Sequence, residues 1–222
     1  MERISWESIG SSKAFRFTVG PQKREFTIHT ALVACQSHAL KTLVSGNFSE
    51  ARNGHAVLEA VDEQTFARFL QYAYTGDYDA TAADAAVGPW SRSDAPLGWS
   101  SRSSHKETLN GEDKAEVFLS HARLHVFADY YGVSDLMDLT LKKLGGALIL
   151  FKPSGERSSE DIVALLRYCY DTPAPEVLKS FVVLYAACKA EVLWKSEAFQ
   201  ELAAGNCELL FAFLGQVMET LA

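Results

Sequence analysis

Two segments in the first third of the chain constrain its fold more than any other feature. Phe26 to Leu43 begins with alternating apolar and polar residues and then changes to the three-and-four spacing of a helix. Val61 to Tyr78 contains an amphipathic helix, which Asp62 is suited to cap at its start and which ends at Gly76. Strands that lead into short helices and then into a capped amphipathic helix predict an α+β domain.

The neighbouring residues complete a small sheet. Residues 15–19 alternate, with Phe15, Phe17 and Val19 on one face, and a turn-forming run then leads into a second alternating segment. This pattern predicts a β-hairpin. We expect two short helices and a third strand to follow the hairpin, over residues 29–35, 37–45 and 55–59.

Residues 79–114 differ from their surroundings, because they are rich in Ala, Ser, Gly and Asp and show little periodicity. We therefore predict a flexible insertion there. It contains Trp90 and Trp99, each followed by a serine. These two sites fit either a docking or phosphorylation motif or a surface insertion that the fold tolerates, and we favour the second interpretation. The domain that the insertion interrupts is expected to span residues 14–150.

The rest of the sequence predicts helices. Residues 116–131 carry an apolar stripe, and Ser134 is expected to cap a second striped helix. A helical extension is expected over residues 157–222. Within it, Val177 to about Trp194 is apolar nearly all round and predicts a central buried helix, and a last amphipathic helix begins at Cys207.

The charge balance narrows the classes of partner. A net charge of −7 and an isoelectric point near 5.4 disfavour binding to nucleic acid or to anionic membranes, since both need a basic face. The longest wholly apolar run, Phe181 to Cys188, is much shorter than the ~20 residues of a membrane-spanning helix. The N-terminal segment has no apolar core typical of a secretory signal. We therefore expect the protein in the cytoplasm or the nucleus.

Four cysteines, Cys35, Cys169, Cys188 and Cys207, include no C-x-x-C pair. The even spacing of the last three is compatible with a metal or redox set. Each of the four also falls on an apolar face of a predicted helix, where a free cysteine packs as a small apolar residue. We favour the packing role for all four.

Two histidines, His121 and His125, lie four residues apart on a predicted helix, a spacing that can hold a metal ion. Ala122 stands where a metalloprotease motif carries Glu, and no third ligand is apparent. The sequence has no Gly-rich phosphate loop and no G-x-S-x-G nucleophile elbow. We therefore expect no catalytic residue, no cofactor and no metal site, and we predict that the protein is not an enzyme.

The N-terminal segments resemble a known family. The first matches the BTB/POZ pattern F-x-x-H-x-x-L-x-A-x-x-S-x-x-[FL]-x-x-[LM] at Phe26, His29, Leu32, Ala34, Ser37, Leu40 and Leu43. The second matches the next block of that pattern at Phe66, Phe69, Leu70, Tyr74, Thr75 and Gly76. Residues 121–136 are similar to the helix pair that follows in the family. The chain thus resembles BTB/POZ domain-containing proteins in their compact fungal-type form.

The resemblance implies an α+β BTB/POZ fold, a small mixed sheet with a helical cluster, followed by an all-helical C-terminal extension. Family members pair through their first strand and first helices, which implies a dimer surface around Phe15, Phe17, Leu32 and Leu43. The same four residues also suit an ordinary core. His29, at a strand-to-helix junction, is expected to be buried and hydrogen-bonded.

The sequence departs from the family pattern at places that bear on function. Members usually carry Asp just before the first strand, where this chain has Ser11 to Ala14. The family's cullin-binding members carry a hydrophobic-x-Glu motif shortly after Tyr-Thr-Gly, and the run Asp77 to Ala83 contains no such Glu. Position 125 is His where Tyr is usual.

Three functional hypotheses remain open. The favoured one is a protein–protein interaction module that self-associates or recruits partners through its BTB surface. The second is a substrate adaptor of a cullin-type ubiquitin ligase, and the third is a small-molecule enzyme with a pocket in the helical last third. The expected partners are other proteins, a second copy of the chain or a cullin scaffold, and neither nucleic acid nor a membrane.

Overall fold

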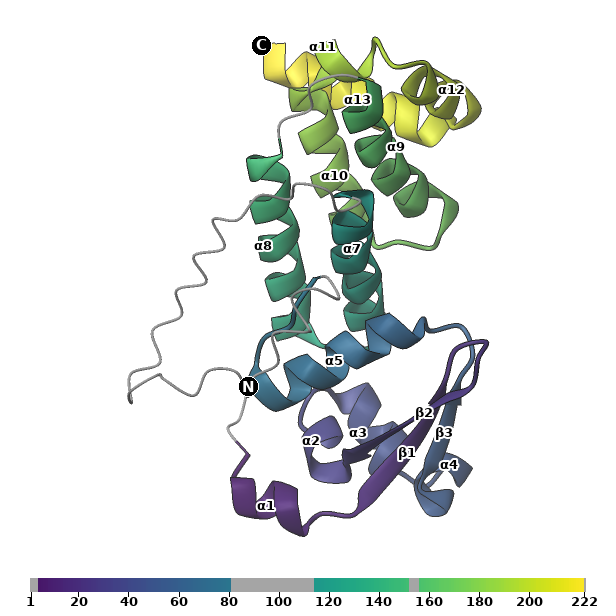
Figure 1. Ribbon diagram of the computed structural model, residues 1–222, viewed down its shortest axis with the longest axis vertical. Helices are drawn as coiled ribbons and strands as arrows, with labels where there is room; N and C mark the ends of the chain where they lie inside the picture. The colour runs from purple at the N-terminus through teal and green to yellow at the C-terminus, as the bar shows by residue number, and fades with distance from the viewer. Residues whose placement is uncertain (1–3, 81–113, 152–155, 222) are drawn as a thin grey trace.

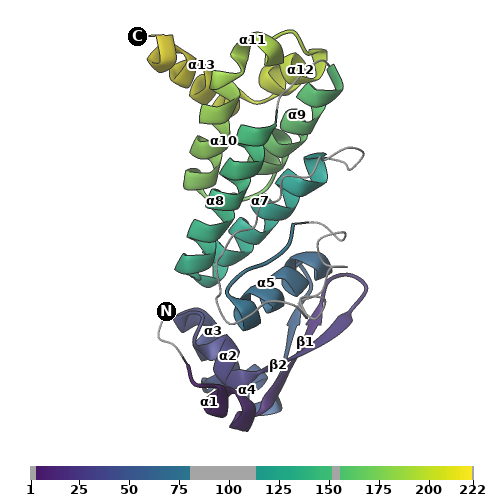
Figure 2. The same cartoon turned by 60° about the vertical axis from the view of Figure 1, so that its left-hand side comes forward.

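The computed structural model describes residues 4–80, 114–151 and 156–221. A part with strands and short helices lies at one end of an elongated molecule, and a bundle of longer helices extends from it to the other end (Figure 1). A view turned about the vertical axis shows the same two-part arrangement (Figure 2). The fold class is α+β with a helical C-terminal region, as the sequence predicts.

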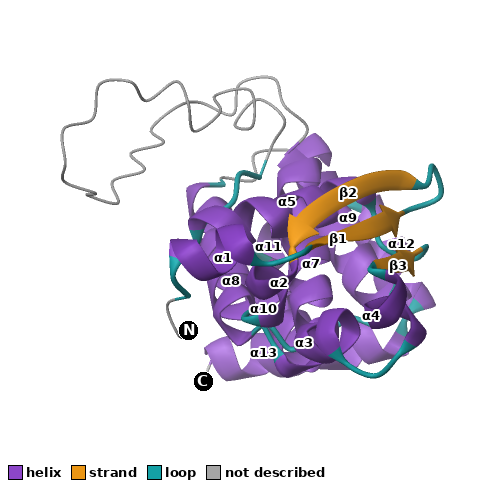
Figure 3. Ribbon diagram, turned by 90° about the horizontal axis from the view of Figure 1, so that it is seen from below, coloured by secondary structure: helices purple, strands orange, loops and turns teal. Residues whose placement is uncertain are grey.

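The sheet has three strands in the order β2-β1-β3 (Figure 3). β1 (Ala14–Val19) pairs antiparallel with β2 (Arg24–His29) and parallel with β3 (His55–Leu58). Alternation along β1 places Phe15, Phe17 and Val19 on the buried face. The two pairings of β1 confirm the predicted hairpin and the predicted third strand.

The hairpin turn is fastened to the helix that covers the sheet. Gly20 begins the turn with a φ of 72°, a left-handed conformation that favours glycine. The Glu63 side chain occupies the space where a Cβ at position 20 would lie, and its carboxylate accepts a hydrogen bond from the Gln22 amide at 3.2 Å. Any larger residue at position 20 would therefore be strained in its backbone and would also clash with the Glu63 side chain.

Five helices complete the N-terminal part: α1 (Trp6–Ser11), α2 (Thr30–Ala34), α3 (His38–Ser45), α4 (Ser49–Asn53) and α5 (Glu63–Thr75). The predicted caps of α5 are present. Asp62 accepts a hydrogen bond from the Thr65 amide at 2.8 Å, and Gly76 ends the helix with a φ of 76°. The sequence patterns did not predict α1 or α4, which are six and five residues long.

Residues 114–151 and 156–221 form seven helices: α7 (Lys114–Tyr131), α8 (Ser134–Leu150), α9 (Glu156–Asp171), α10 (Glu176–Cys188), α11 (Ala190–Leu193), α12 (Glu197–Gly205) and α13 (Cys207–Leu221). Two predictions for this region were wrong. Val133 rather than Ser134 is the N-terminal boundary residue of α8, and it makes no side-chain cap. The helix predicted from Val177 to Trp194 is interrupted at Lys189, where φ is −114° and ψ is 17°.

α10 is also less enclosed than its composition predicts. Neighbouring helices α9 and α13 cover one side, where Leu178, Val182 and Ala186 are buried. Val177 and Leu184 lie on the open side and are exposed. An apolar residue count therefore overestimated the burial of this helix.

Buried apolar side chains form two clusters, and α7 and α8 contribute to both. The N-terminal cluster joins the sheet, α5 and the adjacent ends of α7 and α8; its members include Phe15, Phe17, Phe66, Phe69, Leu124, Phe127 and Leu136. The C-terminal cluster joins the other ends of α7 and α8 to the last helices; its members include Phe118, Leu144, Leu148, Leu166, Val182, Phe199 and Phe213. The helical region is thus packed directly on α7 and α8.

Candidate protein-interaction surface

The residues predicted for a dimer surface lie mostly in the interior of the single chain. Phe15 and Phe17 point from the central strand β1 toward α5, and the Phe17 ring centroid lies 5.0 Å from that of Phe66. Leu32 on α2 is buried, and Leu43 on α3 is half-buried. Phe15, Phe17 and Leu32 therefore contribute to the core, which is the alternative role that the sequence left open.

The family-pattern residues cluster where the sheet meets the helices. Phe26 is half-buried with its ring centroid 5.2 Å from Phe66, and Ser37 caps α3 by accepting a hydrogen bond from the Leu40 amide at 3.1 Å. Leu32 and Ala34 lie on α2, where Ala34 is half-buried.

His29 occupies the junction of β2 and α2, as predicted. Its Nδ1 lies 3.0 Å from the Tyr74 hydroxyl, and the two groups share a hydrogen bond that ties the junction to the last turn of α5, just before Gly76. The prediction of full burial was wrong, because His29 is half-buried and Tyr74 is exposed. The pair therefore lies at the edge of the N-terminal part rather than inside it.

A surface that the sequence patterns do not predict lies at α1. Trp6 is 75% exposed on this helix, whereas Ile9, three residues further along, is buried in the core. Ser5 caps the helix by accepting a hydrogen bond from the Ser8 amide at 3.1 Å. The signal was present in the sequence as a serine that precedes Trp6 and an acidic residue, but a six-residue helix shows too little periodicity to be recognised.

Hydrogen bonds hold α1 against α2. The Ser12 hydroxyl donates to the Ile9 carbonyl at 2.8 Å and accepts from the Ala31 amide at 3.3 Å. The Thr30 amide and hydroxyl both donate to the Lys13 carbonyl oxygen, each at 2.8 Å. Trp6 is thus an exposed aromatic side chain on a fixed support. We call Trp6 with the supporting helices α1 and α2 the α1 surface.

The segment after α5 is fixed by buried polar contacts. Tyr78 is 1% exposed, and its hydroxyl lies 2.7 Å from Nδ1 of His121 on α7. Burial raises the pKa of Tyr78 well above its usual range. Lys143 of α8 places its ammonium 4.5 Å from the centre of the Tyr78 ring, binds the Asp77 carboxylate at 2.5 Å and donates to the Tyr78 carbonyl oxygen.

Arg68 of α5 fixes the next two residues. Its Nε donates to the Asp79 carbonyl at 3.2 Å and its Nη2 to the Ala80 carbonyl at 2.8 Å. Burial lowers the pKa of Arg68, although the carboxylates of Glu116 and Asp62 oppose that effect. Residues 77–80 are therefore held by contacts from α5, α7 and α8.

The two histidines considered for metal binding have separate partners. His125 Nδ1 lies 2.9 Å from the Thr140 hydroxyl, and its buried Nε2 has no hydrogen-bond partner among the described residues. Burial lowers the pKa of His125 below its usual range. His121 instead contacts Tyr78. Within residues 4–80, 114–151 and 156–221, no group of three or more His, Cys, Asp or Glu side chains could hold a metal ion.

The cysteines do not share one environment. Cys169 is buried in the C-terminal cluster, and burial raises its pKa to about 12. Cys35 is half-buried, and its pKa is also raised by burial. Cys188 and Cys207 are exposed, so the prediction that all four pack as small apolar residues was wrong for these two.

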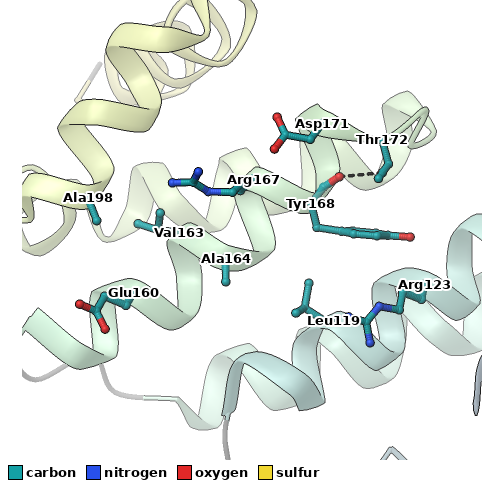
Figure 4. Close-up of a pocket in the computed structure, with 10 residues that line it drawn as sticks. All are labelled: Leu119, Arg123, Glu160, Val163, Ala164, Arg167, Tyr168, Asp171, Thr172 and Ala198. Carbon is teal, nitrogen blue, oxygen red and sulfur yellow. Dashed lines mark hydrogen bonds between the residues drawn. The ribbon is translucent and has the colours of Figure 1, made fainter.

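An open groove of about 540 Å³ lies between α7, α9 and α12 (Figure 4). Leu119 and Arg123 of α7 face Tyr168 of α9 across it, and burial raises the pKa of Tyr168. The Arg123 guanidinium already binds Glu116 at 2.7 Å. Among the side chains drawn in Figure 4, the one hydrogen bond joins the Thr172 hydroxyl to the Tyr168 carbonyl oxygen at 2.6 Å. The groove lining therefore presents no hydrogen-bonded nucleophile and base.

The model for the BTB/POZ domain family matches residues 15–87, a range that begins in β1 and extends beyond Tyr78. This chain is a BTB/POZ domain-containing protein. Its BTB/POZ domain has the small mixed sheet and the helices described above, and a helical C-terminal region follows them. A comparison with curated proteins gives no match.

The BTB/POZ domain is in general a protein–protein interaction module and is not a catalytic domain. The coarse functional prediction from the sequence is therefore confirmed. Within the described parts of this BTB/POZ protein, no helix is long and apolar enough to cross a membrane.

Proposed function

We propose that this BTB/POZ protein acts as an interaction module that binds a second copy of itself through the α1 surface and recruits other proteins in that form. The observation that supports the proposal is Trp6, 75% exposed on a helix that Ser12 and Thr30 fasten to the domain. A large aromatic side chain on a rigid support is typical of an interface anchor.

The proposal is tested by the mass of the full chain at micromolar concentration, measured by light scattering coupled to size exclusion. We expect a dimer for the unmodified chain and a monomer for Trp6→Glu, because a carboxylate at the centre of an apolar contact is left desolvated and unpaired. Phe48→Glu is the matched control, since Phe48 is another exposed aromatic residue of the same domain. A monomeric unmodified chain that captures no protein from a lysate would exclude the proposal.

The cullin-adaptor hypothesis has less support in the geometry. The segment that follows Gly76 lacks the expected Glu, and its aromatic residue Tyr78 is buried against His121 and Lys143 instead of being presented to a partner. Titration with a purified cullin N-terminal domain decides this alternative. We expect no binding above background, and saturable binding at micromolar concentration would reinstate the hypothesis.

Under this proposal the groove beside Tyr168 is not a catalytic site. A thermal-shift screen against a metabolite panel is expected to give no stabilised sample, since a ligand that binds only the folded chain raises the unfolding temperature. A reproducible shift that Tyr168→Ala abolishes would instead support the hypothesis of a helical small-molecule enzyme.

A further inference from the structure

The last helix has an apolar face with no covering element among the described residues. Phe211, Leu214 and Met218 of α13 are 75%, 45% and 69% exposed. Their spacing of three and four residues places them on one side of the helix, and the opposite side holds Leu209 and Phe213 in the core. α13 therefore has two apolar faces, of which only one is buried. We call Phe211, Leu214 and Met218 the α13 stripe.

The α13 stripe lies far from the sheet. Figures 1 and 2 both show α13 at the end of the molecule opposite to β1 and α1. The stripe is thus separate from the α1 surface, and one copy of the chain can use both at the same time.

The charges on α13 are all negative. Its sequence contains Glu208 and Glu219 and no lysine or arginine. At 3.6 residues per turn, positions eleven apart project within about 20° of each other, so the two carboxylates border the same side of the α13 stripe. Lys179 of the neighbouring helix α10 binds the Glu208 carboxylate at 2.8 Å. The Gln216 side chain donates a hydrogen bond to the Glu219 carboxylate at 3.1 Å.

The surrounding region has the same sign. Residues 156–222 contain ten acidic and five basic residues. An apolar stripe with an acidic border in an acidic region is complementary to an amphipathic helix that carries lysine or arginine along one border. A second copy of α13 fits less well, because it would bring acidic borders toward one shared interface and add no cation.

We propose that the α13 stripe docks an amphipathic helix of another protein, one with an apolar face and a basic border. The apolar contacts supply most of the affinity, and an ion pair with Glu219 sets the direction and the choice of partner, since Glu208 already binds Lys179. The proposal does not depend on self-association through the α1 surface.

Two synthetic helical peptides serve as probes. Both carry leucines at the spacing of the α13 stripe; the first has lysines along one border, and its twin has glutamines at the same positions. Binding to the full chain is followed by fluorescence anisotropy of the labelled peptide. We expect saturable binding of the lysine peptide and clearly weaker binding of the glutamine twin.

Substitution of the stripe separates docking from simple charge attraction. Phe211→Glu removes an apolar contact and also adds a negative charge. Docking predicts that the lysine peptide binds this variant at least about tenfold more weakly, given the usual contribution of a buried aromatic side chain. Simple attraction predicts stronger binding. Ile149→Glu is the matched control, because Ile149 is also apolar and exposed but lies on α8. The affinity of this variant for the lysine peptide is expected to stay within about twofold of that of the unmodified chain.

The acidic border has its own test. Glu219→Gln is expected to weaken binding of the lysine peptide severalfold and to leave binding of the glutamine twin unchanged. Circular dichroism checks that each variant is folded.

The proposal is overturned if Phe211→Glu binds the lysine peptide as well as the unmodified chain does. It is equally overturned if Phe211→Glu halves the sedimentation mass of the chain alone, because the stripe would then bind a second copy. Trp6→Glu is expected to leave peptide binding unchanged, so the two interface proposals fail independently.

Discussion

At His125, an imidazole nitrogen is buried without a hydrogen-bond partner among the described residues, while the other nitrogen contacts Thr140. Such a site favours the neutral ring, because protonation would place a charge in a poorly solvated position. In the unfolded chain the same ring protonates near its ordinary pKa. The folded state therefore binds fewer protons than the unfolded state in mildly acidic solution.

We predict that the free energy of unfolding falls as pH is lowered through the ordinary histidine range. The pKa of His125 is lower in the folded state than in the unfolded state, so the unfolded state takes up the proton first as pH falls. The free energy of unfolding therefore decreases by at most about 1.4 kcal/mol per pH unit. Urea unfolding at about pH 7.5 and about pH 5.5 measures the change. His125→Gln keeps hydrogen-bonding groups but does not titrate, and the change should be smaller in this variant. An equal pH dependence in both proteins would contradict the assignment.

The thiols allow a second prediction for single residues. Cys188 and Cys207 are exposed, whereas Cys169 is buried and its pKa is raised to about 12. Since the thiolate is the reactive form, Cys169 should resist alkylation in the folded chain. Mass spectrometry after a short iodoacetamide treatment should find Cys188 and Cys207 modified and Cys169 unmodified. Denaturant should remove this selectivity, and rapid labelling of Cys169 without denaturant would show that the C-terminal cluster opens readily.

Individual residues also show where sequence reading was sufficient and where it was not. The family pattern located Phe26, Ser37 and Gly76 because each acts through local backbone geometry or nearby packing. The exposure of Cys188 and the contact of Tyr78 with His121 depend on elements that are distant in the sequence. Such contacts leave no local periodicity, so they were not predictable from one chain.

At the scale of the elements, α8 is linked to the segment after α5 by one ammonium group. Lys143 contacts the Asp77 carboxylate and the Tyr78 carbonyl oxygen, and its side chain is about a quarter exposed. We predict that Lys143→Met lowers the free energy of unfolding by about 1–3 kcal/mol, since the carbonyl loses its donor while the apolar stem is kept. Lys142→Met at the adjacent exposed position is the control, with an expected change within about 0.5 kcal/mol. Equal effects in chemical denaturation would rule out the role given to Lys143.

Regular elements with strong periodicity were predicted well, and short or interrupted ones were not. The hairpin and α5 followed from alternation and from the caps Asp62 and Gly76. α1 and α4 are too short to repeat a pattern, and the interruption at Lys189 lies inside an apolar run that looks continuous. For α13 the periodicity was correct, but a helix with apolar residues on two faces does not reveal which face the chain covers.

For the whole molecule, α7 and α8 belong to both buried clusters. Loss of either cluster removes the surface on which the other one packs, so we predict a single cooperative unfolding transition. Leu144→Ala, in the C-terminal cluster, should lower the free energy of unfolding by about 2–5 kcal/mol and increase hydrogen exchange in β1 and β2 as well. Leu150→Ala, at an exposed position of the same helix, should have little effect. Exchange that increases only in α9 to α13 would show two independent units.

The strand order β2-β1-β3 also has a kinetic consequence. β1 and β2 are joined by a short turn and can meet early, whereas the parallel partner β3 comes only after α2, α3 and α4. Closing that longer stretch of chain costs more entropy, so the pairing of Arg16 with His55 and of Val19 with Leu58 should form late on the folding route. Changes in β3 should then accelerate unfolding and leave the rate of folding nearly unaltered.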